Sequence, residues 1–577
     1  MVATAAGLEG QHPAHAHGHS QSWVRAHILS TDHKVIGINY MITSFIFFLI
    51  AGLVAMVMRA NLAQPHSTVV SPDLFNQLVT MHGSAMIFAF TIPMLMSGFG
   101  NYLMPLMIGA GDVAFPRLNL FSYLIFPPGA LLMFCGFLTG GAAQAGWTSY
   151  VPLSTQTPIG QTHPLGQIFW LLSVMTLGVS STATAINFLV TIFNMRAPGL
   201  GLMRLPLFIW ALLVTVVLTL IATPALAGGL GVQLLQIVFG APFFNPQEGG
   251  NALLWQHMFW FYSHPAVYIM ILPAFGIISE VIPVFSRKPI FGYKAIAYSS
   301  MAIGLLAFLV WAHHMFTSGV QAWLEVYFMI STMVIAIPTG IKVFSWVATL
   351  FEGKVQLTAP LLFALGFVST FTLGGITGIM LASVPVDLHE HGTYFLVAHL
   401  HYVLFGGSVF GVFTGLYMWW PKITGRMLDD RLGKLHFWFM YIFFNLTFFP
   451  MHIIGLLGMP RRVADYDPQF AGWNMFISIC SFILGASFLI FIYNAAVSLA
   501  RGERAPSNPW GARTLEWATN SPPGHGNFVR TPVVTWAPYD YTKPLPYFGP
   551  PTQEAPELQA RQREAPKVHT TQHDEGI

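Results

Sequence analysis

Long apolar runs dominate this chain and limit what it can fold into. A helix needs about 20 mostly apolar residues to cross a bilayer, and twelve runs of the 577-residue sequence meet that requirement. The runs are continuous rather than alternating in polarity, which favours helices over a β-barrel. We therefore predict an all-α membrane protein, a bundle of twelve transmembrane helices. The approximate spans are 35–58, 74–108, 121–140, 166–195, 206–236, 252–284, 292–316, 325–350, 358–383, 393–420, 433–459 and 470–500.

The composition excludes other classes of protein. Charged residues make up 8% of the chain, against about 25% in soluble globular proteins. A formal net charge of +3 supplies no basic surface for nucleic acid. Cys135 and Cys480 lie far apart in apolar runs, so they predict neither a disulfide framework nor a thiolate metal site.

Polar stretches flank the apolar region. We predict a cytoplasmic N-terminal segment over residues 1–34, the helical core over 35–500, and a proline-rich cytoplasmic tail over 501–577. The N-terminal segment contains a cluster of histidines that could bind a metal, although a solvated tail is the simpler interpretation. These histidines are His12, His15, His17 and His19.

The distribution of Lys and Arg predicts the orientation, because cytoplasmic loops carry an excess of both. With twelve spans, both termini lie on one side, and most basic loop residues lie on that side too. They are Arg25, Lys34, Arg117, Arg196, Arg204, Arg287, Lys288, Lys294, Lys354, Lys422, Arg426, Arg431 and Lys434. The other side has Arg59, Arg461 and Arg462. We therefore expect cytoplasmic termini, and acidic groups near the three exceptions.

Lys342 lies inside an apolar run. A lysine at mid-membrane costs about 3 kcal/mol on insertion scales. We therefore expect Lys342 to line a polar cavity or a proton path.

Six histidines at or near the outer halves of four spans indicate metal centres. They are His82, His264, His313, His314, His399 and His401. His399 and His401 are two residues apart, about 200° around a helix. They must point to opposite sides, and so could serve two separate cofactors.

The remaining spacing favours one shared ion. His264 and Tyr268 lie at positions i and i+4, on one helix face. His313 and His314 are adjacent, so both reach one metal only if the backbone departs there from a regular helix. Three imidazoles suit copper or zinc, and the phenol of Tyr268 adds redox capacity that favours copper.

A single histidine in a membrane commonly hydrogen-bonds to a neighbouring helix. We apply that interpretation to His257, His436 and His452. Six histidines with complementary directions are too rare in membranes for the same explanation. The geometry predicts redox chemistry and leaves the reaction open.

Several motifs then resemble one family, subunit I of the haem–copper oxidases of the cytochrome c oxidase type. They are Ser-Thr-Asp-His-Lys at 30–34, Gly-Asn-Tyr-Leu-Met-Pro-Leu-Met-Ile-Gly at 100–109, Pro-Thr-Gly-Ile-Lys at 338–342, Gly-Met-Pro-Arg-Arg at 458–462, Glu-Trp at 516–517 and Ser-Pro-Pro at 521–523. The resemblance covers nearly the whole chain, with the motifs in the family's order.

The resemblance implies a bundle around two haems and one copper. A low-spin haem A would lie between His82 and His401, and a high-spin haem of the A type would bind His399. Copper would bind His264, His313 and His314, with Tyr268 joined covalently to His264. Arg461 and Arg462 match arginines that bind haem propionates, and Arg59 matches one near the low-spin haem's formyl group.

The family's reaction is the four-electron reduction of O2 to water, coupled to proton pumping across a bacterial cell (inner) membrane. The electrons would come from cytochrome c through a partner subunit II with a dicopper site, in a complex with subunit III and others. One proton path would use Lys342, Thr339 and Ser279. The other would use Asp112, Asn101, Asn119, Asn187, Ser180 and Ser181.

Two departures from the family pattern matter. Ala266 stands where many members have Glu, and Tyr262-Ser263 resembles the subgroup in which a tyrosine hydroxyl replaces that carboxylate. We assign that proton transfer to Tyr262. The family's magnesium site has a His-Asp pair, which is His391-Gly392 here. A Mg or Mn ion on His391 would need Glu390 or Asp387 in compensation.

Three alternatives remain. A quinol oxidase shares the haem–copper centre, but the positions of its quinone site are apolar here, as Ile50, Val54 and Leu74. A nitric oxide reductase lacks the tyrosine seen as Tyr268 and the Lys342 motif. A non-enzymatic twelve-span transporter would show no haem absorbance, and transporters commonly have inverted repeats, of which this sequence shows none.

Overall fold

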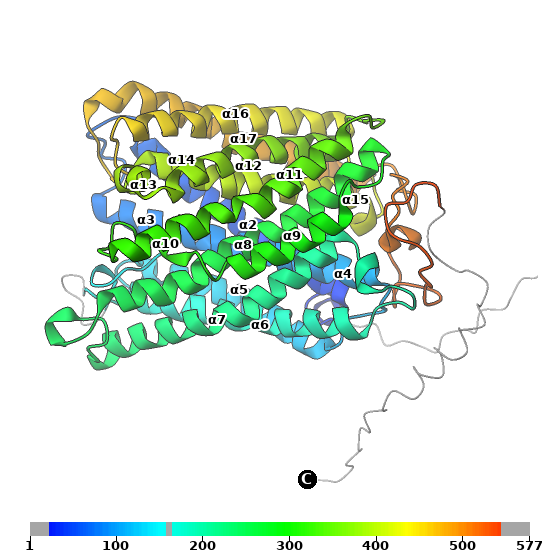
Figure 1. Cartoon of the computed structure of the whole chain (residues 1–577), viewed down its shortest axis with the longest axis horizontal. Helices are drawn as coiled ribbons and strands as arrows, with labels where there is room; N and C mark the ends of the chain where they lie inside the picture. Colours follow the sequence, from blue (N-terminus) through cyan, green and yellow to red (C-terminus); the bar gives the residue numbers. More distant parts are fainter. Residues whose placement is uncertain (1–21, 157–163, 544–577) are drawn as a thin grey trace, which may run out of the picture.

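The computed structural model describes residues 22–156 and 164–543, and the predicted histidine cluster at residues 12–19 lies outside them. The described chain is a bundle of long helices that run side by side along one axis (Figure 1). The helices are α1 (Trp23–His27), α2 (His33–Asn61), α3 (Pro72–Ser84), α4 (Gly100–Ile108), α5 (Pro116–Leu132), α6 (Leu165–Asn194), α7 (Leu207–Phe239), α8 (Ala252–Ser286), α9 (Tyr293–Leu306), α10 (Ala322–Val334), α11 (Ala336–Leu350), α12 (Ala359–Ala382), α13 (Val384–Glu390), α14 (Tyr394–Val403), α15 (Phe410–Thr424), α16 (Asp430–Leu456) and α17 (Ala471–Arg501). Short helical turns are η1 (Ala85–Thr91), η2 (Pro93–Phe99), η3 (Met133–Leu138), η4 (Leu153–Thr155), η5 (Leu202–Arg204), η6 (Pro246–Glu248), η7 (Trp311–Met315), η8 (Leu404–Val409), η9 (Pro468–Phe470) and η10 (Leu515–Ala518).

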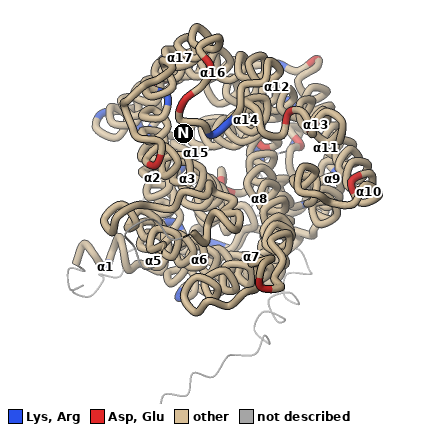
Figure 2. The backbone as a smooth tube through the Cα atoms, turned by 90° about the vertical axis from the view of Figure 1, so that its left-hand side faces the viewer, with Lys and Arg blue, Asp and Glu red and all other residues tan. Residues whose placement is uncertain are grey.

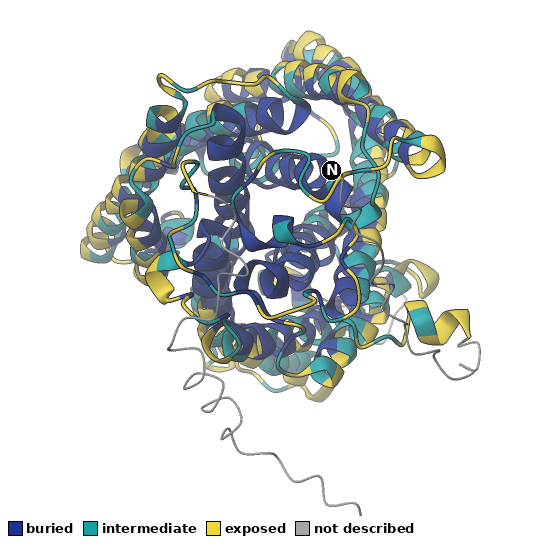
Figure 3. Ribbon diagram, turned by 90° about the vertical axis from the view of Figure 1, so that its right-hand side faces the viewer, coloured by how far each residue is buried: buried dark blue, intermediate teal, exposed yellow. Residues whose placement is uncertain are grey.

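The long helices have the length and apolarity of membrane spans. Eleven helices in the described ranges are long and apolar enough to cross a bilayer. Lys, Arg, Asp and Glu are sparse along the backbone (Figure 2). Buried residues fill the centre of the bundle and exposed ones lie on its outer faces, as expected of helices with lipid around them (Figure 3). The predicted all-α membrane class is confirmed.

The seventh predicted span, 292–316, is wrong as a single helix. Helix α9 ends at Leu306 after 14 residues. A helix of this length is too short to cross a bilayer by itself. A turn follows, and then the tight 3₁₀ turn η7, which contains the histidine doublet. Apolar residues on both sides of the break hid it from the hydropathy pattern. The departure from regular helix that His313 and His314 required is confirmed.

Wider turns interrupt two other spans near the candidate ligands. The π-helical turns η1 and η2 follow His82 in the span Pro72–Ile108, and the π-helical turn η8 follows His401. A π turn adds a residue to the helical ladder and rotates the following residues relative to the preceding ones. Because of these turns, His82 and His401 point in directions that a regular helix through the rest of each span would not give them.

The segment after α17 packs over one end of the bundle, as its orange trace shows (Figure 1). Glu516 and Trp517 within it are buried. Lys422 Nζ, at the end of α15, donates to the carbonyls of Ser507, Thr519 and Asn520 at 2.8, 2.7 and 3.2 Å. This segment therefore belongs to the folded body up to residue 543.

Close packing of α14 and α16 generates a prediction. A Cβ atom at Gly455 would overlap the backbone nitrogen of Phe395. We expect Gly455→Ala to destabilise the protein by about 1–3 kcal/mol, as overpacking does, and to lower the thermal midpoint of the detergent-solubilised protein. Gly231→Ala on α7 is the control, because a Cβ there meets nothing within 4 Å. Equal midpoints for the two variants would contradict the close approach of α14 and α16.

Candidate metal centre and proton-conducting residues

Three imidazoles converge in the interior of the bundle. His264 comes from α8, and His313 and His314 come from η7. One nitrogen of each ring lies within 4.8 Å of the others, and these three form a group of potential ligands in the described chain. Nε2 of His314 lies 3.0 Å from Nε2 of His313 and 3.2 Å from Nδ1 of His264.

These distances fit a shared ion. Metal–imidazole bonds are about 2.0 Å long, so nitrogens on one tetrahedral ion lie about 3.3 Å apart. Neighbouring groups fix the ring orientations. Nδ1 of His313 lies 2.9 Å from the Thr332 hydroxyl, and the rings of Trp260 and His314 stack with their centroids 3.7 Å apart. The residues present therefore suit a metal ion held by three nitrogens.

Tyr268 lies one turn beyond His264 on the same helix. The ring centroids are 4.8 Å apart, as the i, i+4 spacing predicts. Nε2 of His264 is buried and has no hydrogen-bond partner in the described chain. That nitrogen is therefore available to the phenol ring, while Nδ1 faces the other two histidines.

His82 and His401 face each other with nearly parallel rings. Their centroids are 6.4 Å apart and the planes differ by 13°. Nδ1 of His82 donates to the Ala51 carbonyl at 2.9 Å, and Nδ1 of His401 donates to the Val397 carbonyl at 2.8 Å. Both Nε2 atoms keep a lone pair. Two imidazoles bonded in line to one iron have ring centres about 6 Å apart, so this pair fits a haem iron.

His399 points away from His401, which confirms the directional prediction. His401 stacks on Phe448 of α16 at 4.2 Å, whereas His399 Nδ1 lies 3.0 Å from the Gly374 carbonyl of α12. The carbonyl can only accept, so Nε2 of His399 is the free ligand atom. A Cβ at Gly378 would lie 3.0 Å from the His399 ring, and the glycine makes room for it.

Arg59, Arg461 and Arg462 lie together near one end of the bundle, and none of their guanidinium groups forms an ion pair with a described residue. Arg59 Nη2 donates to Asn474 and Ser478, but its Nε and Nη1 are buried without partners. Neither Arg461 nor Arg462 forms an ion pair within the described residues. Burial, together with the neighbouring Arg462, lowers the pKa of Arg461 to about 9. Such groups fit an acidic or carbonyl-bearing ligand.

His391 pairs with one of the two carboxylates considered for it. Its Nδ1 lies 2.9 Å from Asp387 Oδ2, whereas Glu390 Oε2 accepts a bond from the Thr393 hydroxyl. Mg²⁺ and Mn²⁺ prefer several oxygen ligands, and this pair supplies one carboxylate.

Lys342 is buried, and its Nζ atom donates two hydrogen bonds. It donates to the Ile296 carbonyl at 3.0 Å and to the Ser300 hydroxyl at 2.6 Å, both on α9. Thr339 lies one turn earlier on α11 and bonds to its own helix, and Ser279 is buried on the neighbouring α8. Ser300 was not predicted, because one serine in an apolar run carries no signal of its own.

The asparagines of the other predicted path gather around the loop 109–115. Asn187 Oδ1 accepts from the Phe115 backbone N–H at 2.9 Å. Both amide atoms of Asn119 and Oδ1 of Asn101 are buried without partners in the described chain. Burial raises the pKa of the Asp112 carboxyl at the start of this row. Unpartnered polar atoms in a row are sites where ordered water binds.

Farther into the bundle, hydroxyl groups continue this row. Ser180 donates to the Ser122 carbonyl at 2.7 Å, and the Tyr40 hydroxyl lies 3.0 Å from Ser180 Oγ and 3.1 Å from Ser122 Oγ. Ser181 instead bonds back to Leu177 of its own helix. Tyr40 and Ser122 were missed by the sequence analysis, because tyrosine and serine are common in packed helices.

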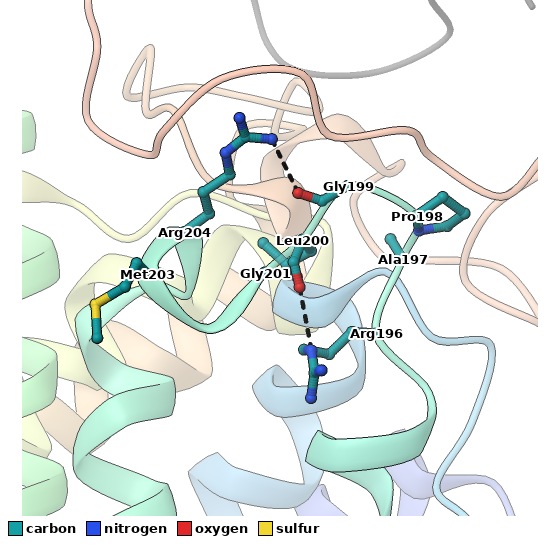
Figure 4. Close-up of a pocket in the computed structure, with 8 residues that line it drawn as sticks. All are labelled: Arg196, Ala197, Pro198, Gly199, Leu200, Gly201, Met203 and Arg204. Atoms are coloured by element: carbon teal, nitrogen blue, oxygen red, sulfur yellow. Dashed lines mark hydrogen bonds between the residues drawn. The ribbon is translucent and has the colours of Figure 1, made fainter. Parts of the chain in front are cut away.

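The α6–α7 loop supports this region from outside. The Ala197 N–H donates to the Ile108 carbonyl at 2.8 Å. Arg196 and Arg204 donate to loop carbonyls at 3.1 and 3.0 Å around an open hollow of about 570 Å³ (Figure 4). The two arginine bonds stay within the loop and fix its shape, and the Ala197 bond joins the loop to the end of α4.

Tyr262 lies on α8, two residues before His264, and is 7% exposed. Its hydroxyl forms no hydrogen bond within the described residues, and Ser263 Oγ is buried without a partner there. Ala266 is buried one turn farther along α8. A hydroxyl is therefore the polar group that α8 offers at this level.

The histidines interpreted as structural have ordinary partners. His257 accepts from the Trp311 indole at 3.3 Å, and His436 Nδ1 lies 3.2 Å from the Tyr417 hydroxyl. His452 bonds to the Phe449 carbonyl of its own helix at 3.3 Å. Two of the three thus bond to another element, as expected.

Comparison with known proteins gives consistent matches. Residues 35–483 match the family described as cytochrome c and quinol oxidase polypeptide I. The chain is 53% identical over 525 residues to cytochrome c oxidase subunit 1 of Thermostichus vulcanus, covering 91% of this chain and 94% of the relative. It is 52% identical to the protein of the same name from Synechocystis sp., covering 94% and 96%. A cryo-EM structure of a haem–copper terminal oxidase dimer matches with a TM-score of 0.66 at 20% identity, covering 82% of this chain and 85% of that one.

The central position of His314 generates a prediction about metal content. Its Nε2 atom is the one that contacts both other nitrogens, so we expect His314→Ala to lose most of the copper bound by this chain, measured by elemental analysis. The control is His257→Ala, whose ring bonds to Trp311 instead. Equal copper contents in the two variants would contradict a shared ion at the cluster.

Proposed function

The chain belongs to the family of cytochrome c and quinol oxidase polypeptide I and is a subunit of a terminal respiratory oxidase that reduces O2, and we propose that the reaction takes place between the three-histidine cluster and His399. The observation that carries this proposal is the convergence of three imidazole nitrogens within 4.8 Å inside the bundle. Membership of the family implies haems and a copper ion. Copper would bind His264, His313 and His314, and the two haem irons would bind His399 and the His82–His401 pair.

When bound, the metals would pass the donor's electrons to O2 and supply Lewis acidity. The protein's own contribution is to fix the imidazoles, keep water out and hold protons at chosen atoms. Nδ1 hydrogen bonds to Ala51, Val397 and Gly374 direct the free Nε2 atoms. Tyr268 holds a phenolic proton within reach of the cluster, and we propose that it donates this proton to the reacting oxygen. We also propose that a ring carbon of Tyr268 is joined to Nε2 of His264; this bond would replace a ring C–H and the Nε2–H, and the two protons and two electrons released would go to O2.

The arginines would complete the two haem sites. Arg461 and Arg462 have no carboxylate partner in the described chain, which supports a role in binding haem propionates. The unpartnered Nε and Nη1 atoms of Arg59 support a bond to a ring substituent of the low-spin haem. We propose haem A at both sites.

Two proton paths would serve the reaction. Lys342, with Thr339, Ser279 and the added Ser300, forms the first. The second starts at Asp112, follows the asparagines Asn187, Asn119 and Asn101, and continues through Ser180 and Tyr40 towards Tyr262. Each electron delivered to a buried site favours uptake of a proton, and this coupling would drive pumping.

We propose cytochrome c as the electron donor, acting through a partner subunit with a dicopper site. The apolar Ile50, Val54 and Leu74 argue against a quinone site. We propose that α9, the turn after it and η7 together form the seventh crossing, so that both termini lie on the cytoplasmic side of a bacterial cell membrane, as the basic loops support. The Tyr262-Ser263 pair supports the subgroup that uses a tyrosine in place of the glutamate.

Oxygen consumption tests the metal site. The assembled oxidase should consume oxygen with reduced cytochrome c, and cyanide should inhibit it. His264→Ala and His399→Ala should each abolish turnover, because each removes a metal ligand, while the proteins still insert in the membrane. Oxygen uptake at the unmodified rate in either variant would refute the assignment.

Proton pumping tests Tyr262. We expect Tyr262→Phe to slow turnover by roughly tenfold or more, as the loss of a proton-transfer group does, or to lower the protons pumped per electron in vesicles. The control is Tyr298→Phe, whose side chain is 51% exposed on α9. Unchanged rate and stoichiometry in Tyr262→Phe would remove this residue from the path.

A further inference from the structure

We propose that Asn527, in the segment after α17, is a positioning residue for proton uptake at Asp112: its amide holds His33 and Lys34 against the Asp112 loop in both protonation states of His33. This inference rests on the proposed path through Asp112. It makes the C-terminal segment a working part of the proton entrance.

Asn527 joins three separate elements. Its Nδ2 donates to the Ala110 carbonyl of the 109–115 loop at 2.8 Å. Its Oδ1 accepts from Lys34 Nζ of α2 at 2.9 Å. Nε2 of His33 lies 2.8 Å from Nδ2 and 3.1 Å from Oδ1. Asn527 is 7% exposed and His33 is fully buried, so water competes little for these bonds.

The partners fix the amide orientation. The Ala110 carbonyl can only accept and the Lys34 ammonium can only donate, so Nδ2 must face Ala110 and Oδ1 must face Lys34. The ring of His33 is fixed in the same way. Its Nδ1 lies 2.7 Å from the Asn101 carbonyl and therefore carries a hydrogen.

The amide then satisfies His33 whether or not the ring is charged. In the neutral ring, Nε2 has a lone pair and accepts from Asn527 Nδ2. In the protonated ring, Nε2–H donates to Oδ1 of the same amide. A side-chain amide offers a donor and an acceptor next to each other, so His33 can gain or lose a proton without any movement of its neighbours.

The surrounding charges make such an exchange useful. Lys34, Asp32 and Asp112 are the charged groups that act on His33, and Lys34 pairs with Asp32 at 3.0 Å. Burial raises the pKa of the Asp112 carboxyl, and the His33 ring opposes that rise. A ring that changes charge beside this carboxyl alters how readily Asp112 takes up a proton.

The backbone at Asn527 permits a clean test. Its φ is +66°, in the left-handed region that Asn and Gly tolerate. Asn527→Gly therefore removes the amide and keeps the turn. Asn527→Asp keeps the turn and the acceptor while it adds a negative charge.

The experiment measures proton uptake and turnover of the assembled oxidase in vesicles as a function of pH. We expect Asn527→Gly to slow both by about fivefold, the factor expected for one lost hydrogen bond. The protonated ring loses the stronger, charge-assisted bond, so the midpoint of the step in the pH profile that follows the titration of His33 should move to lower pH. Asn527→Asp should move it to higher pH.

The control is Asn508→Gly. Asn508 lies in the same segment, and its side chain bonds to Ala512 alone among the described residues. Its loss should therefore leave the rate and the midpoint as in the unmodified protein. If the oxidase with Asn527→Gly does not assemble, Asn527→Asp provides the test: a midpoint at higher pH supports the inference, and a midpoint at lower pH overturns it. Unshifted midpoints at position 527 would overturn the inference. Asp112→Asn separates the two proposals. Unchanged proton uptake in that variant refutes the path through Asp112. If Asp112→Asn blocks uptake but the variants at position 527 show unshifted midpoints, only the role of Asn527 is refuted.

Discussion

The cost of burying polar groups in an apolar bundle governs this structure. Moving an amide or a charged group from water into the bundle without a partner costs several kcal/mol, and several candidate functional side chains have a partner from the backbone. Ala51 orients His82, Gly374 orients His399 and Ile296 accepts from Lys342. In all three cases the acceptor lies on another helix. The packing of the helices therefore determines where the ligand atoms and the ammonium group can be.

Groups that remain without partners are equally informative. Within the described residues, Nε and Nη1 of Arg59 and Nε2 of His264 have no hydrogen-bond partner, and Arg461 and Arg462 form no ion pair. A native fold leaves few such atoms unsatisfied. They indicate what would bind there: anionic groups at the arginines, and the Tyr268 ring or a metal at the histidines. The unpartnered amides of Asn119 point in the same way to water.

The sequence predicted those parts of the site that depend on spacing along one helix. The opposite directions of His399 and His401 and the shared face of His264 and Tyr268 follow from 3.6 residues per turn. The need for a break at His313 and His314 follows from their adjacency. Contacts between helices were beyond this reasoning. Tyr40, Ser122, Ser300 and Asn527 acquire their roles only from neighbours distant in the chain, and isolated polar residues carry no periodic signal. The end of α9 was misplaced for a related reason, because hydropathy averages over a turn.

The short helix α9 also bears on how the protein is made. With 14 residues, it cannot insert stably as an independent span, since the insertion machinery favours longer apolar helices. Its placement depends on the helices that it packs against most, α11 and α7, and α11 follows it in the chain. Biosynthesis would therefore leave the histidine doublet of η7 accessible until late in assembly. Binding of the metal by the doublet and closure of the bundle would then be one event in time.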